Sequence, residues 1–124
     1  GWRMAVLGYC TTVERELRAS YRALRDKVAA VRNTESTTLK SLGDAIDALA
    51  RLVDWLSKSK PVPSGLSALA SSLDALKRLN GVRIRAAHPK DQQVSRKEAV
   101  WVRQALLTSP SPLIITIVAV RPNQ

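Results

Sequence analysis

Arginine side chains recur at helical spacing early in the sequence. They are Arg15, Arg18, Arg22, Arg25 and Arg32. At about 100° per residue these five positions share an arc of about 100° on an α-helix, and the first and last lie about 25 Å apart along its axis. Guanidinium groups bind phosphate oxygens in bidentate geometry. Duplex DNA carries one charge per about 1.7 Å of axis, so we expect this arginine stripe to follow several backbone phosphates.

A second group of cations lies in the last third of the chain. The wider group also includes Lys77, Arg78, Lys90 and Arg103, and the four members expected to contact phosphate are Arg83, Arg85, Arg96 and Lys97. The first two alternate with apolar residues, which predicts a short strand carrying both guanidinium groups on one face. The last two occupy the first turn of a predicted helix. An anion docked at that helix N-terminus would meet backbone N–H groups and both cations together.

The overall charge favours a polyanionic partner. The chain of 124 residues has a net charge of +10, from 20 Lys and Arg against 10 Asp and Glu. Thirteen of those cations are arginines, and the arginine stripe is weakly compensated by acids. A solvated helix face is the competing interpretation, since charge runs on helices commonly face water. Few aromatic residues are present to stack on bases, so we expect backbone contact without sequence preference.

Catalytic patterns are missing from the sequence, and we expect neither an enzyme nor a cofactor or metal site. The single histidine, His88, precedes a proline and has no evident partner. Cys10 follows a short apolar segment and is expected to be buried. Because it is the single cysteine, an internal disulfide and a cysteine zinc cluster are both excluded. We therefore expect an intracellular or virion-associated protein rather than a secreted disulfide scaffold.

The elements that must position these cations follow from hydrophobic spacing. Residues 12–33 show one apolar helical face, after a capping-box pattern formed by Thr11 and Glu14. Residues 39–56 carry a coiled-coil-like apolar seam. A proline-containing linker over 60–65 separates this helix from a third, which Asn80-Gly81 should end.

The remaining residues predict a change of structure. A strand is expected over 82–85 and a helix over 95–107, the latter opened by a capping box of Ser95 and Glu98. The β-branched run 113–120 is expected to be a second strand. The fold class is thus mainly α, with a three-to-four-helix bundle over about 11–80 and a small β-α-β element over about 81–124. Both parts belong to one expected domain, 1–124.

The predicted terminal strand suggests self-assembly. It is apolar on both faces, so both faces need cover that one small helical domain has difficulty providing. Either helices of the same chain or a neighbouring subunit would cover it, and we favour the subunit. The residues expected to form the assembly contact are Leu113, Ile115, Ile117, Val118 and Val120. The same run is far shorter than the ~20 apolar residues of a membrane span, so we expect no span.

Together these features predict a structural protein that coats or packages nucleic acid, in the manner of a nucleoprotein or virion coat. A helical adaptor subunit that binds an acidic protein partner is the alternative, because it would need the same basic surface. The sequence leaves open whether the nucleic acid is DNA or RNA, single- or double-stranded, and which symmetry the assembly has.

Overall fold

The computed structural model describes residues 2–26, 39–88 and 93–122. Their helices are α1 (Trp2–Asp26), α3 (Leu42–Leu56), α4 (Leu66–Ala87), α5 (Arg96–Arg103) and α6 (Leu113–Ala119), with one π-helical turn, η1 (Gln104–Thr108), continuing α5. The mainly α prediction is confirmed. The described residues contain no strand, so the predicted C-terminal β-α-β element is wrong.

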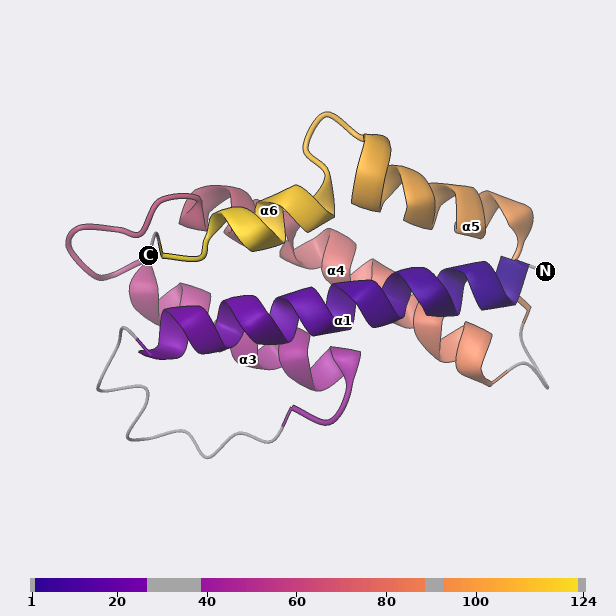
Figure 1. Cartoon of the computed structure of the whole chain (residues 1–124), viewed down its shortest axis with the longest axis horizontal. Helices are drawn as coiled ribbons and strands as arrows, with labels where there is room; N and C mark the ends of the chain where they lie inside the picture. Colours follow the sequence, from indigo (N-terminus) through magenta and orange to yellow (C-terminus); the bar gives the residue numbers. More distant parts are fainter. Residues whose placement is uncertain (1, 27–38, 89–92, 123–124) are drawn as a thin grey trace.

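Helix α1 runs along the long axis of the molecule and organises the rest (Figure 1). It packs against α3, α4, α5 and α6, while α4 also contacts α3 and α6. In the view of Figure 1, α5 and α6 follow one another above α1 and α3 lies below it. The beginning of α1 therefore meets the end of α4 and the beginning of α5, although both of these lie more than 80 residues later in the sequence.

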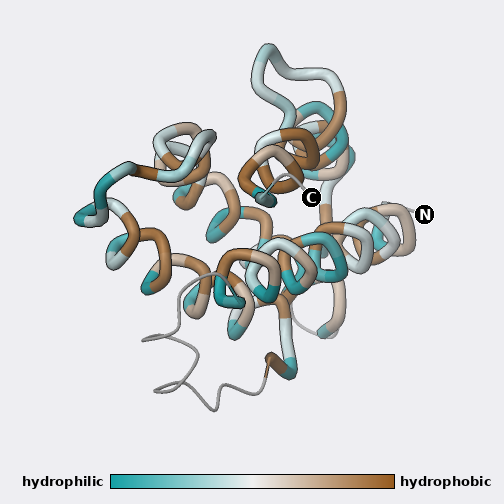
Figure 2. The backbone as a smooth tube through the Cα atoms, turned by 60° about the vertical axis from the view of Figure 1, so that its left-hand side comes forward, coloured by the Kyte–Doolittle hydropathy of each residue, from teal (hydrophilic) through white to brown (hydrophobic). Residues whose placement is uncertain are grey.

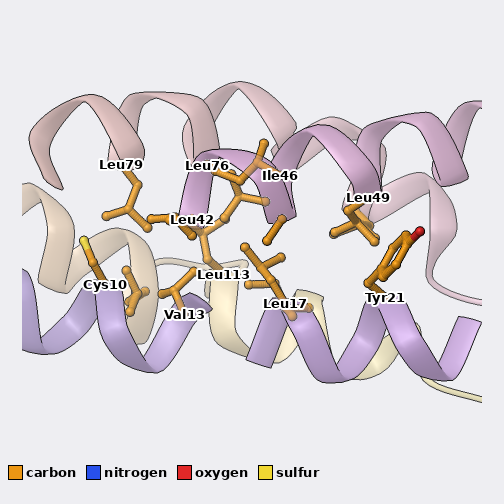
Figure 3. Close-up of a cluster of buried hydrophobic side chains, with 14 of the residues drawn as sticks. Cys10, Val13, Leu17, Tyr21, Leu42, Ile46, Leu49, Leu76, Leu79 and Leu113 are labelled. Atoms are coloured by element: carbon orange, nitrogen blue, oxygen red, sulfur yellow. The ribbon is translucent and has the colours of Figure 1, made fainter. Parts of the chain in front are cut away.

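The core forms between the apolar faces of these helices (Figures 2 and 3). In α1 the buried positions recur every three or four residues and include Val6, Val13, Leu17 and Leu24. The seam predicted for 39–56 is buried from Leu42 to Leu56. Leucines of α4 complete the cluster that Figure 3 shows. Aliphatic packing at helical spacing thus builds the core that the sequence pattern indicated.

The first helix begins earlier than predicted. It starts at Trp2, ten residues before the predicted start, and Thr11 lies in its interior. The Thr11 hydroxyl donates to the Leu7 carbonyl at 2.9 Å, one turn earlier, so it caps nothing. Buried Val6 and Cys10 extend the apolar face toward the N-terminus, which makes continuation favourable. The predicted end at Asn33 and the turn over 33–38 fall outside the described residues.

Asn80-Gly81 does not end the third helix. Helix α4 continues through both residues to Ala87, so the strand predicted over 82–85 is wrong. Val82 and Ala86 are buried and extend the apolar stripe of the helix. Their burial outweighs the roughly 1 kcal/mol that glycine costs in a helix interior. In the described chain the one glycine with positive φ is Gly65, at the start of α4.

The segment predicted as the terminal strand is helix α6. Its buried residues are Leu113, Thr116 and Ile117, and the C-cap residue Val120 is also buried. The apolar members Leu113, Ile117 and Val120 step by four and three, whereas Ile115 and Val118 are exposed. One-sided burial at this period selects a helix over the strand favoured by β-branched residues. Among the described residues no single helix is long and apolar enough to cross a membrane, although α5–η1 and α6 jointly pass that test across a bend.

Candidate nucleic-acid interface

The arginine stripe is divided by its orientation on α1. Arg15 and Arg22 are exposed on the side opposite the core, whereas Arg18 and Arg25 are partly buried. The latter pair lies about 100° from the centre of the buried face, at 100° per residue, which places both side chains against neighbouring structure. Arg32 lies outside the described residues.

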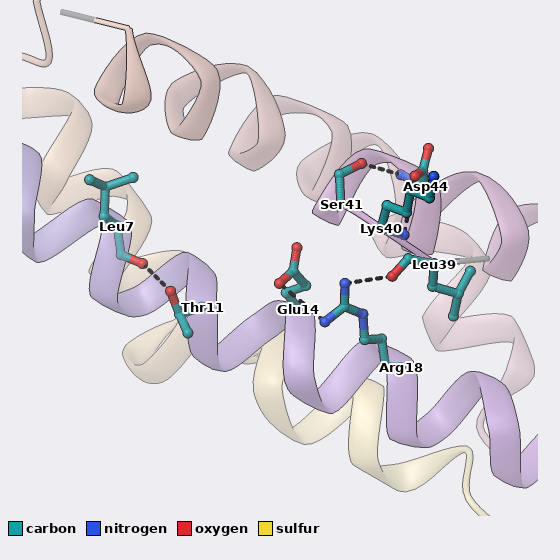
Figure 4. Close-up of polar contacts among 8 residues, drawn as sticks. All are labelled: Leu7, Thr11, Glu14, Arg18, Leu39, Lys40, Ser41 and Asp44. Carbon is teal, nitrogen blue, oxygen red and sulfur yellow. Dashed lines mark hydrogen bonds and ion pairs between the residues drawn. The ribbon is translucent and has the colours of Figure 1, made fainter.

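Arg18 is engaged in holding the fold (Figure 4). Its Nη2 donates to the Leu39 carbonyl at 2.5 Å, and its Nη1 lies 3.5 Å from the Glu14 carboxylate. The side chain is 29% exposed, and its Nε is buried with no hydrogen-bond partner. This arginine therefore ties α1 to the segment that leads into α3, and phosphate binding would compete with those contacts.

Arg25 is also partly committed to contacts within the protein. Its Nη2 lies 3.7 Å from the Asp26 carboxylate, and its guanidinium carbon is 5.6 Å from the centroid of the Tyr21 ring. Its Nε is buried without a hydrogen-bond partner. Within the described part of the stripe, Arg15 and Arg22 are therefore the two side chains most available to a ligand.

Arg83 and Arg85 do not share one face. They lie on helix α4, where two residues are about 200° apart, instead of on the predicted strand. Arg83 donates through Nε to the Asn80 side chain at 3.3 Å, and Arg85 pairs with Glu98 of α5. The prediction that these two guanidinium groups project from one strand face is therefore wrong.

A different group of cations meets at one end of the molecule. We call this group the basic end and define it as Arg3, Arg85, Arg96 and Lys97. Arg3 donates through Nε to the Ala86 carbonyl, and the Arg96 guanidinium carbon lies 5.9 Å from the centroid of the Trp2 ring. These contacts, with the Arg85–Glu98 ion pair, join α1, α4 and α5 at the end marked N in Figure 1.

The predicted capping box at the start of α5 is confirmed. The Ser95 hydroxyl accepts from the Glu98 N–H at 3.1 Å, and the Glu98 carboxylate accepts from the Ser95 N–H at 3.1 Å. Burial alone would raise the pKa of Glu98, but hydrogen bonds from Ser95 and Arg85 hold that pKa below its usual value. The cap uses one amide of the helix N-terminus, so that N–H is unavailable to an anion. Arg96 and Lys97 are exposed and form the cationic part of this site.

Cys10 and His88 have side chains of types suited to catalysis. Burial raises the pKa of the Cys10 thiol to about 11, against a smaller opposing effect of Arg83. The thiol is therefore protonated at neutral pH and inaccessible to a substrate. His88 is exposed at the end of α4. Among the described residues, no three His, Cys, Asp or Glu side chains are grouped so as to hold a metal ion.

The predicted assembly residues are divided between core and surface. Leu113, Ile117 and Val120 are buried within the protein, so they are unavailable to a second copy. Ile115 is 62% exposed and Val118 is 42% exposed. These two are three residues apart on α6 and therefore neighbours on its outer face.

A polar network that the sequence patterns did not predict attaches the C-terminal segment to α1. Arg121 places Nη2 2.7 Å from the Glu16 carboxylate and donates through Nε to the Ser20 hydroxyl at 2.8 Å. The fully buried Ser20 donates in turn to the Ile117 carbonyl at 2.7 Å. A serine on the otherwise apolar face of a helix was the available signal, since a buried hydroxyl needs a partner.

Comparison with known proteins adds no functional assignment to this geometry. The chain matches no protein-family model, and neither the curated protein sequences nor the solved structures include a significant match.

Proposed function

We propose that the protein binds nucleic-acid backbones without sequence preference and self-assembles on them, as a structural rather than a catalytic protein. The observation that carries the proposal is the basic end, where cations from three helices converge on a chain of net charge +10. Convergent cations raise the local potential more than the same charges spread over the surface. Arginine binds phosphate oxygens in bidentate geometry, and lysine binds them as a point charge.

Availability of the side chains supports this location. Arg3, Arg96 and Lys97 are exposed, whereas Arg85 is partly buried against Glu98. The two cations at the start of α5 oppose the helix macrodipole, so docking an anion there would relieve an unfavourable interaction. Arg15 and Arg22 extend the basic surface along the outer side of α1. They form the second part of the proposed interface.

Self-assembly is the other half of the proposal and rests on the outer face of α6. Ile115 and Val118 expose branched apolar side chains beside each other. Contact with a second copy would remove this apolar area from water at about 25 cal/mol per Å². The proposed assembly contact is therefore smaller than the strand contact expected from the sequence.

The test compares two double variants with the same change in charge. Arg96→Glu/Lys97→Glu alters the basic end, and Lys58→Glu/Lys60→Glu alters exposed lysines after α3. Binding to labelled duplex DNA and single-stranded RNA is followed by fluorescence anisotropy at two salt concentrations. We expect the first variant to weaken binding about 100-fold and the control by less than about fivefold. Equal losses would show that net charge alone acts and that the basic end is no site.

The alternative of an adaptor for an acidic protein has one specific observation in its favour. Trp2 is 47% exposed and Met4 is 66% exposed, and both lie close to Arg3 in sequence at the basic end. Aromatic residues, methionine and arginine are enriched in protein–protein interfaces. Length dependence separates the two functions. A coat binds longer nucleic acid more tightly and forms larger particles, whereas an adaptor shows neither effect.

A further inference from the structure

An open cavity of about 440 Å³ lies between α4 on one side and α5, η1 and α6 on the other. The α4 wall is made of small residues, among them Ala68, Ser71 and Ala75. Trp101 of α5 and Leu113 of α6 supply the large apolar surfaces. Its volume falls within the roughly 300–1,000 Å³ typical of small-molecule sites.

The wall opposite α4 depends on the π-helical turn. The Ser109 N–H donates to the Gln104 carbonyl at 2.8 Å, a bond that spans five residues. Trp101, Ala105 and Ser109 all line the cavity at steps of four residues. In a regular α-helix such steps drift by about 40° each, and a wider turn reduces the drift. Turns of this kind frequently occur at functional sites.

One cation, Arg78, contacts a residue of the cavity lining, and the described lining itself is uncharged. The hydroxyls of Ser71, Ser109 and Thr116 donate to carbonyls of their own helical segments, so their protons are already used. The Arg78 guanidinium carbon lies 3.9 Å from the centroid of the ring of Trp101, which is one of the lining residues. No carboxylate belongs to the described lining. An anion would therefore meet a guanidinium held over an aromatic surface.

We propose that this cavity binds a small amphipathic anion, a ligand with a flat apolar body and one carboxylate or sulfonate group. The body would lie against Trp101 and the alanine-lined wall of α4, and the anionic group would contact Arg78. Arginine suits this position because it can stack on the indole and bind an anion with its outer N–H groups. The proposal is independent of the proposed nucleic-acid binding.

The test uses two fluorescent probes of nearly the same shape. One is 1-anilinonaphthalene-8-sulfonate, which is anionic, and the other is N-phenyl-1-naphthylamine, which lacks the sulfonate. Titration of the intact protein should show saturable binding of the sulfonate at one site. Ala68→Leu fills the cavity from an exposed position and should weaken both probes about tenfold. Ala70→Leu is the matched control, since this exposed alanine lies two residues away and outside the lining.

Arg78→Gln tests the charge. It should weaken the sulfonate about fivefold and change binding of the neutral probe less than about twofold. Equal weakening of the two probes would mean that Arg78 merely positions Trp101, and the anionic ligand class would be abandoned. Absence of saturable sulfonate binding, or equal effects of the two alanine replacements, would overturn the site itself.

Discussion

Replacing Ser20 with alanine should destabilise the protein by detaching its C-terminal segment. Ser20 is fully buried, and its hydroxyl both donates to the Ile117 carbonyl and accepts from Arg121 Nε. The Ser20→Ala substitution removes one oxygen but leaves two groups without that partner. The substitution therefore weakens the attachment of α6, and of the residues that follow α6, to α1.

The magnitude follows from these two hydrogen bonds. Loss of the neutral bond to Ile117 costs about 1 kcal/mol, and loss of the charged bond from Arg121 about 1.5 kcal/mol. Arg121 retains its bonds to the Glu16 carboxylate and carbonyl, at 2.7 and 3.0 Å, so it stays in place. Alanine recovers about 0.5 kcal/mol through its higher helix propensity. The net decrease in the free energy of unfolding should be about 2 kcal/mol.

Equilibrium urea unfolding followed by circular dichroism measures this loss. With a slope of about 1.5 kcal/mol per M, the midpoint should fall by about 1.3 M. Ser71→Ala is the control, because this exposed helical serine donates to the Ser67 carbonyl at 3.1 Å and should change stability by less than about 0.5 kcal/mol. Unfolding of the Ser20→Ala variant at the wild-type midpoint would contradict a stabilising role of these two hydrogen bonds.

A double-mutant cycle with Arg121→Met isolates the contribution of the network. Because Ser20 and Arg121 are bonded directly, their effects should be less than additive by about 1 kcal/mol. Additive effects would show that Ser20 stabilises α6 alone, without the link to Arg121.

Three further predictions follow from the helices. Gly81→Ala should raise the free energy of unfolding by about 0.5–1 kcal/mol in urea titrations, since Gly81 lies inside α4 and a Cβ there meets nothing within 4 Å; destabilisation would contradict the continuous helix. Ile115→Asp should leave the circular dichroism spectrum unchanged and reduce particle mass in light scattering, whereas Ile117→Asp should unfold the protein, because Ile115 is exposed and Ile117 is buried. The lowered pKa of Glu98 contributes stability that is present above the unfolded-state pKa and disappears as the pH falls through the folded-state value. Glu98→Gln should therefore cost stability at pH 7 and much less at pH 2 in urea titrations, and an equal cost at both pH values would refute this electrostatic account.

Hydrophobic periodicity predicted the helical core because burial repeats with the turn of the helix. The seam from Leu42 to Leu56 is buried where it was expected, and Ser95 caps α5 through a local pattern of one turn. Both features depend on residues within one segment, so the sequence contains what is needed to identify them. The start of α1 was missed because Thr11 and Glu14 imitate a cap inside a longer helix.

The wrong predictions have a common physical cause: tertiary burial overrode local preference. Asn80-Gly81 is a good helix terminator in isolation, yet α4 continues through it. Burial of the apolar stripe beyond these two residues stabilises the helix more than the strand. The β-branched run of α6 has strand propensity, but its environment covers one side only. A run with both faces apolar becomes helical when half of it packs on α1 and the other half faces outward.

The candidate interface was predictable in charge but not in position. An arc of arginines on a helix identifies one side of that helix, and the neighbours that cover part of the arc come from elsewhere in the chain. Arg18 thus donates a hydrogen bond to the Leu39 carbonyl. Arg3 belongs to the basic end because it donates to the carbonyl of Ala86, which lies 83 positions away in the sequence. Spacing along one helix contains no information about such partners.

This change of position alters the proposed mode of binding. A continuous stripe would let each copy follow several phosphates along one strand, whereas the basic end offers three exposed cations, Arg3, Arg96 and Lys97, in one patch. Arg15 and Arg22 form the separate second part of the interface on α1, so the basic end by itself contacts few phosphates. Neutralising about three phosphates gives a slope of about −3 in log affinity against log salt concentration on duplex DNA. Three phosphate contacts are too few for tight binding by one copy at physiological salt. Packaging by this protein would therefore require the α6 contact, because only an assembled array would present enough patches to hold a long nucleic acid.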